Sequence, residues 1–429
     1  MIRFIYNLFW PLGLLIFLPG YFAKMIRRGG YREKFGQRLG IYDGEVRNRL
    51  SNQRPTWLHA VSVGEVNIAL KLAIALRALE PELGCVLTTT TTTGFALARK
   101  TAPSWIEVMY TPLDYWPIMR RAFSVICPAR IVLVEAEVWP NLAAAAHARR
   151  IPLALVNARL SPRSERRYRR FRFFVAPTFR LLDLVCVPER GDVERWTALG
   201  VSRNRIHVTG SIKFDPDVQA QSHTATGSIS DAFSPDSLVL FGGSTHRGEE
   251  EILVRVFLRL REQFPSLRLF IAPRHVERLQ EIRAHLAAMP LRVTLASEAL
   301  TCDAADADCM LLDTTGELQR WYGIATVVFI GKSLTAHGGQ NPVEPILAGK
   351  PVVFGPHMEN FATLAKTLVS NNAAMQINDI DSLERAVGEL LRDSESRQRL
   401  VENAHAALSE HERATARAAT LIHELQPKR

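Results

Sequence analysis

Short apolar runs alternate with helical stretches along most of this chain, in two successive series. The first series has strand-like runs at 56–61, 85–90, 131–135, 153–157 and 184–188, and the second has them at 238–242, 267–272, 310–313, 327–330 and 351–354. Apolar runs separated by helices predict parallel strands that helices cover on both faces. The fold class is therefore α/β, with two doubly wound Rossmann-like domains and an interdomain cleft in which ligands bind.

The domain limits follow from the same pattern. The length of 429 residues fits two domains better than one. Residues 215–237 are polar, contain Gly, Pro and Ser, and are poor in large apolar side chains, so we expect a linker there. The expected parts are a membrane anchor at 1–25, a first domain at 26–214 and a second at 238–429. We leave open whether the last helix packs back on the first domain.

The N-terminal segment Phe4–Ala23 contains twenty residues and no charge. That length just suffices for a helix that spans a bilayer, which needs about 20 apolar residues. Basic residues follow it, which would put the rest of the chain in the cytoplasm. Its Pro and Gly residues leave open a segment that lies in the membrane interface. The alternative is a buried first helix of a soluble domain.

The net charge of +10 is concentrated in two short regions. Residues 1–38, which end at Arg38, and residues 159–172 each hold seven basic residues and one acid, so the rest of the chain is slightly acidic. Beside a membrane segment, this pattern favours anionic lipid over nucleic acid, with a merely solvated basic helix as the alternative. In the second region we expect the acceptor or lipid to contact five residues, which are Arg159, Arg163, Ser164, Arg166 and Arg167. The five scattered Cys lack a CxxC spacing and indicate a reducing compartment.

Three acidic side chains follow strands of the first series. Glu65 opens a helix after the strand at 56–61, where the helix dipole stabilises its anion, so it suits a general base or a simple first-turn cap. Glu135 and Glu137 share one face of an extended chain and either act in catalysis or pair with Arg. Lys213, two residues after Ser211, adds a cation near the end of the domain.

Three motifs follow strands of the second series. Residues 242–249 (GGSTHRGE) let the backbone approach a ligand, and either Ser244 or Thr245 could cap the helix that follows. They lack the GK[ST] of a P-loop, which disfavours a hydrolytic NTPase. Residues 273–275 place Pro273, Arg274 and His275 at a strand end. Residues 337–345 (HGGQNPVEP) offer backbone amides to a phosphate and Glu344 to a sugar diol. With no aspartate cluster in the sequence, we expect neither metal nor cofactor.

The motifs in this order resemble the 3-deoxy-D-manno-octulosonic acid (Kdo) transferases, which move Kdo from CMP-Kdo onto the lipid A precursor at the bacterial inner membrane. The matching segments are WLHAVSVGEV, TTTTTTG, VEAEVWPN, NARLSPRS, GSIKFD, FGGSTHRGEEE, APRH, DTTGEL and HGGQNPVEP. The resemblance implies the GT-B glycosyltransferase fold, with an acceptor-binding first domain and a CMP-sugar-binding second domain on the cytoplasmic side of the membrane. It also implies inversion at the sugar and no metal.

The resemblance implies roles for individual residues. Glu65 matches the proposed base, and Glu135 or Glu137 would orient acceptor and donor. The residues expected to bind CMP-Kdo are Ser211, Lys213, Ser244, Thr245, Pro273, Arg274, His275, Gly316, Glu317, Gly339, Asn341 and Glu344. The expected partners are CMP-Kdo, the lipid A precursor lipid IVA and an anionic membrane surface, without nucleic acid.

Three other functions stay open at this point. Another GT-B glycosyltransferase would use a UDP-sugar on a lipid acceptor. A nucleotide-sugar epimerase of the same fold would need neither an anchor nor a basic acceptor surface. A non-catalytic nucleotide-sugar binder at the membrane would keep the motif at 337–345 and would not need Glu65. The number of Kdo units transferred and the oligomeric state do not follow from the sequence.

Overall fold

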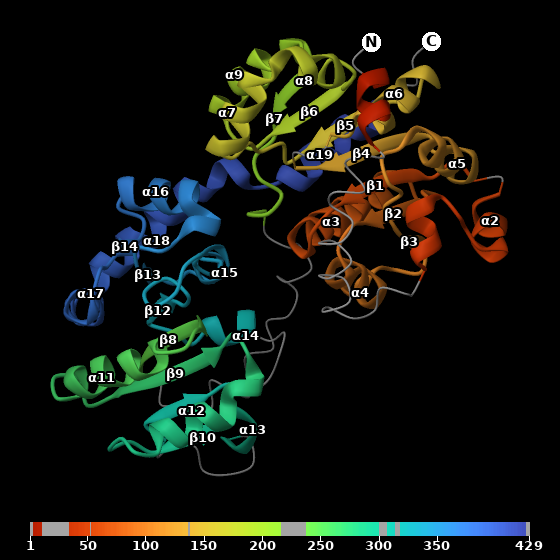
Figure 1. Ribbon diagram of the computed structural model, residues 1–429. Coiled ribbons are helices and arrows are strands. Elements are labelled where there is room, and N and C mark those ends of the chain that lie inside the picture. Colours follow the sequence, from red (N-terminus) through yellow and green to blue (C-terminus); the bar gives the residue numbers. More distant parts are fainter. Residues whose placement is uncertain are drawn as a thin grey trace. The chain divides into compact units, whose positions relative to one another are not determined.

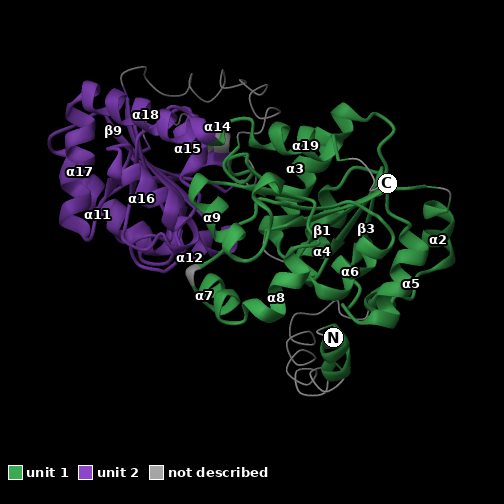
Figure 2. Ribbon diagram, turned by 90° about the horizontal axis from the view of Figure 1, so that it is seen from above, with its two compact units in different colours: residues 1–215, 411–429 green, residues 216–410 purple. Residues whose placement is uncertain are grey.

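A computed structural model describes residues 3–10, 34–51, 53–135, 138–215, 237–299, 307–313 and 318–425. Its contacts divide the chain into two compact units, unit 1 (Met1–Asp215 and His411–Arg429) and unit 2 (Pro216–Glu410), which Figure 2 colours separately. Four sequence predictions fall outside the described residues: most of the anchor (11–23), Glu137, nearly all of the linker (216–236), and Gly316 with Glu317.

Unit 1 is built on a seven-stranded parallel sheet in the order β3-β2-β1-β4-β5-β6-β7 (Figure 1). Its strands are β1 (Thr56–Ala60), β2 (Cys85–Thr89), β3 (Ile106–Tyr110), β4 (Arg130–Val134), β5 (Leu153–Val156), β6 (Leu184–Val187) and β7 (Ile206–Val208). Its helices are η1 (Phe35–Leu39), α2 (Gly44–Leu50), α3 (Val63–Leu79), α4 (Thr92–Thr101), α5 (Trp116–Ile126), α6 (Pro140–Ala148), α7 (Pro162–Arg170), α8 (Arg172–Phe179), α9 (Arg190–Ala198), η2 (Arg203–Arg205) and α19 (Ala414–His423). Residues 3–10 are also helical.

Alternate residues of the central strands of unit 1 enter two different apolar clusters. Trp57 and Leu133 pack in one cluster with residues of α5 and α6, and Leu58 and Val134 pack in the other with residues of α3 and α19. Because successive side chains of a strand point to opposite faces, helices must cover both faces of the sheet. The C-terminal helix α19 thus completes the core of unit 1, beside α3.

Unit 2 has a second seven-stranded parallel sheet, in the order β10-β11-β9-β8-β12-β13-β14. Its strands are β8 (Leu238–Thr245), β9 (Leu267–Pro273), β10 (Val293–Leu295), β11 (Cys309–Leu311), β12 (Val327–Ile330), β13 (Val352–Phe354) and β14 (Met375–Gln376). Its helices are α11 (Glu249–Arg261), η4 (Val276–Arg278), α12 (Leu279–Leu286), α13 (Ala296–Ala299), α14 (Leu318–Tyr322), α15 (Val343–Leu347), η6 (Glu359–Phe361), α16 (Ala362–Ser370), α17 (Ile380–Arg392) and α18 (Ser394–Leu408), and η7 (Ser409–His411) leads into α19. Two doubly wound parallel sheets confirm the predicted α/β class.

The sequence analysis missed four strands, which are β3, β7, β10 and β14. Each is an edge strand of its sheet. Edge strands are short or carry polar residues, as the two-residue β14 and the half-buried Glu107 of β3 do, so they lack the continuous apolar run that marks a central strand. Within the described residues, no helix combines the length and apolar character needed to cross a membrane.

Candidate functional site

The adjacent strands β1 and β4 of unit 1 lie where the strand order reverses, which is the usual ligand site of such sheets. Glu65, in the first turn of α3, follows the carboxyl end of β1. Its Oε2 accepts a hydrogen bond from the Val61 amide (2.8 Å) and its Oε1 accepts one from the Ser62 hydroxyl (2.9 Å), while Ser62 caps α3 by accepting from the Glu65 amide. The side chain is 8% exposed. A capping role is therefore observed, and the catalytic role stays a prediction.

Glu135 directly follows β4, with a φ of 63° and its amide donating to the Val156 carbonyl (2.9 Å). Its carboxylate interacts with Lys213 from the GSIKF segment. Burial lowers the pKa of Lys213, and Glu135 opposes that change by favouring the charged ammonium, while Arg159 adds to the lowering. The structure thus brings together three predicted residues that the sequence separates widely. Electrostatic interaction with Lys213 accounts for part of how Glu135 is stabilised.

Asn157 holds the segment that contains Lys213. Its backbone is left-handed (φ 51°), and its Oδ1 accepts from the Ser211 hydroxyl and from the Ile212 amide, both at 3.2 Å. The Ser211 amide donates to Nδ1 of His411 at 3.4 Å. Ser211, predicted to bind the donor, is therefore buried in a network that ties the strand ends of unit 1 together.

The predicted acceptor residues lie on and before α7. Arg163, Arg166 and Arg167 are exposed on this helix. Ser164 takes part in the cap, because its amide donates to Oγ of Ser161 (3.1 Å) and its hydroxyl accepts from the same atom (3.0 Å). The basic surface expected at residues 159–172 is thus present in the structure.

Arg38 does not belong to a basic surface, although the sequence analysis counted it in the first basic region. Its side chain is buried, stacks 4.2 Å over the ring of Tyr110 and donates to the Thr90 carbonyl at 2.8 Å. A guanidinium can be buried when an aromatic face and a carbonyl replace its water. Its charge therefore supports the fold of unit 1 and is not available to lipid.

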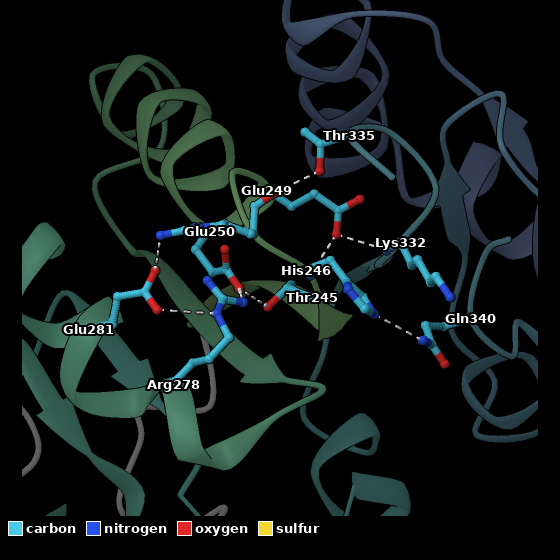
Figure 3. A network of polar contacts seen from close by, with 10 residues as sticks. Thr245, His246, Glu249, Glu250, Arg278, Glu281, Lys332, Thr335 and Gln340 are labelled. Atoms are coloured by element: carbon cyan, nitrogen blue, oxygen red, sulfur yellow. Dashed lines mark hydrogen bonds and ion pairs between the residues drawn. The ribbon is translucent and has the colours of Figure 1, made fainter. Parts of the chain in front are cut away.

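In unit 2 the corresponding reversal of strand order lies between β8 and β12. Glu249, the first residue of α11, bridges the segments that follow these strands (Figure 3). Its carboxylate accepts from four backbone amides, those of His246 (2.8 Å), Lys332 (2.7 Å), Ser333 (3.0 Å) and Leu334 (3.1 Å). Figure 3 draws the first two of these residues. Burial raises the pKa of Glu249, and the four hydrogen bonds act in the opposite direction. The sequence analysis did not identify this residue.

Thr245 and Ser244 lie just before Glu249. The Thr245 hydroxyl donates to Oε1 of Glu250 (3.1 Å), which also pairs with Arg278 (3.0 Å) (Figure 3). The Thr245 carbonyl accepts from the Arg274 amide (3.0 Å). Ser244 has a φ of 54°. Thr245 is fully buried and its hydroxyl donates to Glu250, while α11 begins after Gly248 without a side-chain cap. The helix cap expected from Ser244 or Thr245 is therefore not formed.

Cations surround His246. Its pKa is lowered by burial and then by Lys332, His275, Arg278 and Arg274. Its ring lies edge-on to that of His275 with centroids 5.7 Å apart, and its Nε2 is 3.4 Å from Nε2 of Gln340. A neutral imidazole among several cations is suited to an anion such as a phosphate. Arg274 and His275 were predicted, whereas His246 and Lys332 were not, although His246 stands inside the motif GGSTHRGE.

Asn341 and Glu344 interact directly. Asn341 Nδ2 donates to Oε1 of Glu344 (3.0 Å), and its Oδ1 accepts from the Val343 amide at the start of α15 (3.1 Å). Burial and the nearby charge of Glu344 raise the pKa of Tyr322. Gly339 has a φ of 68°, and its amide donates to the Lys332 carbonyl (2.9 Å), which joins this segment to the cationic cluster. Pro273 pairs with Thr245 at the end of β9.

The predicted site residues thus form two groups. Unit 1 holds Glu65, Glu135, Arg159, Ser211 and Lys213, and unit 2 holds Ser244, Thr245, Pro273, Arg274, His275, Gly339, Asn341 and Glu344. Each group lies at the carboxyl ends of a parallel sheet.

Two family models match this chain. Residues 33–216 match the model of 3-deoxy-D-manno-octulosonic-acid transferase (kdotransferase), and residues 249–407 match that of glycosyl transferases group 1. Among solved structures, a UDP-GlcNAc 2-epimerase from Neisseria meningitidis bound to UDP-GlcNAc has a TM-score of 0.58 at 12% identity, over 87% of this chain and 99% of that one. That likeness shows a shared fold of GT-B type and nothing more.

Two curated relatives carry the same name as the first model. The chain is 31% identical over 393 residues to a 3-deoxy-D-manno-octulosonic acid transferase of Haemophilus influenzae, covering 91% of each. It is 33% identical over 375 residues to one of Bordetella pertussis, covering 85% of each. Together with the two sheets and their motifs, these matches show that the chain belongs to the 3-deoxy-D-manno-octulosonic acid transferase family.

Proposed function

We propose that this protein transfers Kdo from CMP-Kdo onto the lipid A precursor lipid IVA, with inversion at the sugar and without a metal in the chemical step. The family supports the transfer of Kdo. The observation that carries the donor assignment is the cluster of unit 2 in which the rings of His246 and His275 lie 5.7 Å apart, with the positive charges of Lys332, Arg278 and Arg274 close enough to disfavour protonation of His246. Such a cluster suits the phosphate of a nucleotide sugar.

The proposed nucleotide contacts use neighbouring groups of unit 2. The phosphate would lie against Lys332, Arg274 and the imidazoles, and the ribose hydroxyls would donate to Glu344, which Asn341 orients through its 3.0 Å hydrogen bond. Because these cationic side chains are already in position, they do not have to rearrange as negative charge develops on the departing phosphate. Pre-formed positive charge therefore takes the role that a divalent metal has in other transferases.

The proposed base is Glu65. An acceptor hydroxyl oxygen attacks the anomeric carbon of Kdo and gives its proton to the Glu65 carboxylate. The bond from the anomeric carbon to the phosphate oxygen breaks, and CMP leaves with the electron pair. The start of α3, together with the Val61 amide and the Ser62 hydroxyl, favours the ionised carboxylate that must accept the proton.

The proposed acceptor surface and membrane contact lie on unit 1. Residues 3–10, α7 and α8 lie along one edge of this unit in both views (Figures 1 and 2). Large apolar residues are exposed on these segments, with Phe4 at 72% in residues 3–10 and Phe173 at 68% in α8, and α7 carries exposed arginines. Exposed aromatic side chains next to basic ones are typical of surfaces that bind anionic lipid. These features support our proposal that the protein lies at the bacterial inner membrane, with both units on the cytoplasmic side.

The experiment combines purified full-length protein with CMP-Kdo and tetra-acylated lipid A precursor, and mass spectrometry counts the Kdo units on the product. We expect Kdo-modified lipid from CMP-Kdo and none from a UDP-sugar. The substitution Glu344→Ala should weaken CMP binding in calorimetry, whereas Glu389→Ala, at an exposed position of α17, should not. Transfer from a UDP-sugar, or unchanged CMP affinity in Glu344→Ala, would overturn the corresponding assignment.

A further inference from the structure

Two histidines and a glutamate converge beside the donor motif of unit 2. Nδ1 of His337 lies 3.0 Å from Oε1 of Glu359, and Nδ1 of His357 lies 3.5 Å from the same oxygen. One possible ligand atom from each residue lies within 4.8 Å of the others. The two imidazole centroids are 4.0 Å apart. Three side chains that can each give one lone pair to a cation therefore face one small volume.

Hydrogen bonds fix the Glu359 carboxylate and the two backbone segments that carry the histidines. Oε2 of Glu359 accepts from the Gly338 amide at 2.6 Å, which leaves Oε1 directed at the imidazoles. The Asn360 amide donates to the Gly338 carbonyl (2.9 Å), and the His357 amide donates to the Ser333 carbonyl (3.0 Å). Orientation of a ligand by a second hydrogen bond is a regular feature of protein metal sites. The segments at 337–340 and 357–360 are thus already joined.

The three ligand side chains indicate which metal the site would bind. Tetrahedral zinc with bonds of 2.0–2.1 Å places its ligand atoms about 3.3 Å apart, and the distances of 3.0 and 3.5 Å from the Glu359 oxygen lie on either side of that value. Two imidazoles and one carboxylate suit zinc, whereas magnesium and calcium prefer oxygen ligands.

We propose that His337, His357 and Glu359 form a binding site for a zinc-like divalent cation. The metal would link the segment at 337–340 to the one at 357–360, so it would stiffen the glycine turn that precedes Asn341. This role is structural and does not involve the chemical step. It is also independent of the proposed function, because it depends only on the positions of these three side chains.

No metal was expected from the sequence because it contains no aspartate cluster. His337 and Glu359 are 22 positions apart. They meet because the segments that follow β12 and β13 leave the sheet side by side, at neighbouring parallel strands. A motif search for short histidine spacings would miss a site of this kind.

The test is calorimetric titration of the untagged, EDTA-treated full-length protein with zinc chloride, and with magnesium chloride for comparison. We expect one zinc site that magnesium does not fill. Each of His337→Ala, His357→Ala and Glu359→Gln should lower zinc affinity by at least about 10-fold, since even supporting residues of metal sites contribute that much. These side chains lie at or near the surface, so the variants should fold.

A matched control uses a close histidine–glutamate pair that lies elsewhere in the described residues, His423 and Glu80. His423→Ala removes a histidine whose Nδ1 lies 2.7 Å from Glu80 in unit 1, and it should keep full zinc affinity. Amide exchange at 338–340 should slow on zinc addition in the unmodified protein and in His423→Ala, and not in Glu359→Gln. Equal zinc affinity in all these proteins, or a loss in His423→Ala as large as in His337→Ala, would overturn the proposal.

Discussion

Glu65 of unit 1 and Glu249 of unit 2 occupy matching positions, each in the first turn of the helix that follows the first strand of its sheet. Their hydrogen bonds differ. Those of Glu65 to Val61 and Ser62 are local, within four positions of the chain. Glu249 accepts from amides as far away as Leu334, 85 positions on, and is fully buried. A glutamate in the first turn thus makes a local cap in one unit and joins distant backbone segments in the other.

The difference in hydrogen bonding gives the two glutamates different expected roles. A carboxylate has about four acceptor positions, and four backbone amides occupy those of Glu249. Its substitution should therefore damage the fold of the donor site. Glu65 lies at the start of α3, a helix of 17 residues that buries a large apolar face. Because that packing stabilises the helix, substitution of Glu65 should affect catalysis more than folding.

The largest effect is expected from Glu65→Ala. Transfer should fall about 10²–10⁴-fold, which is the usual size of a general-base contribution, while CMP affinity stays unchanged. Single-turnover transfer and calorimetry with CMP measure the two quantities. Glu65→Gln keeps the shape of the side chain and should lose as much activity. If either variant transfers Kdo at nearly the normal rate, the two glutamates differ only in how they hold the backbone.

Glu249→Ala should destabilise unit 2 by about 2–4 kcal/mol, because it leaves several amides without their acceptor in a mostly buried place. Amide exchange at Lys332, Ser333 and Leu334 should become faster, and CMP affinity should fall. The control is Glu251→Ala, on the exposed side of the same helix, where only an ion pair with Arg255 is lost. Equal stability of the two variants would show that the four hydrogen bonds contribute little.

The central strands and the helices between them could be predicted because burial on both faces leaves an apolar run in the sequence. The edge strands could not, since a strand such as β3 pairs on one side only and keeps Glu107 half-exposed. A separate 3₁₀ turn, η6 (Glu359–Phe361), precedes α16 (Ala362–Ser370). That turn directs Glu359 toward the histidines.

The candidate site was predictable where chemistry and local geometry coincide. Arg274 and His275 directly follow β9, and the rule that ligands bind at strand ends is enough to select them. Lys332 and Glu249 come together because β8 pairs with β12. Neither segment contains a sequence pattern that predicts this contact. Arg38 was misassigned because a count of charges does not tell a solvated guanidinium from one stacked on Tyr110.

The smallest effect is expected from the two helix caps. Ser62→Ala in unit 1 and Asp379→Ala in unit 2 each remove an N-cap that accepts from a backbone amide, so each should cost about 1 kcal/mol of stability in its own unit. Only Ser62 also donates to the Glu65 carboxylate, at 2.9 Å, and a hydrogen bond to a charged group is the stronger kind. Transfer should therefore fall about 10-fold in Ser62→Ala and stay normal in Asp379→Ala, as measured by rates at saturating CMP-Kdo. Equal rates in the two variants would mean that the cap of α3 holds the helix without orienting the proposed base.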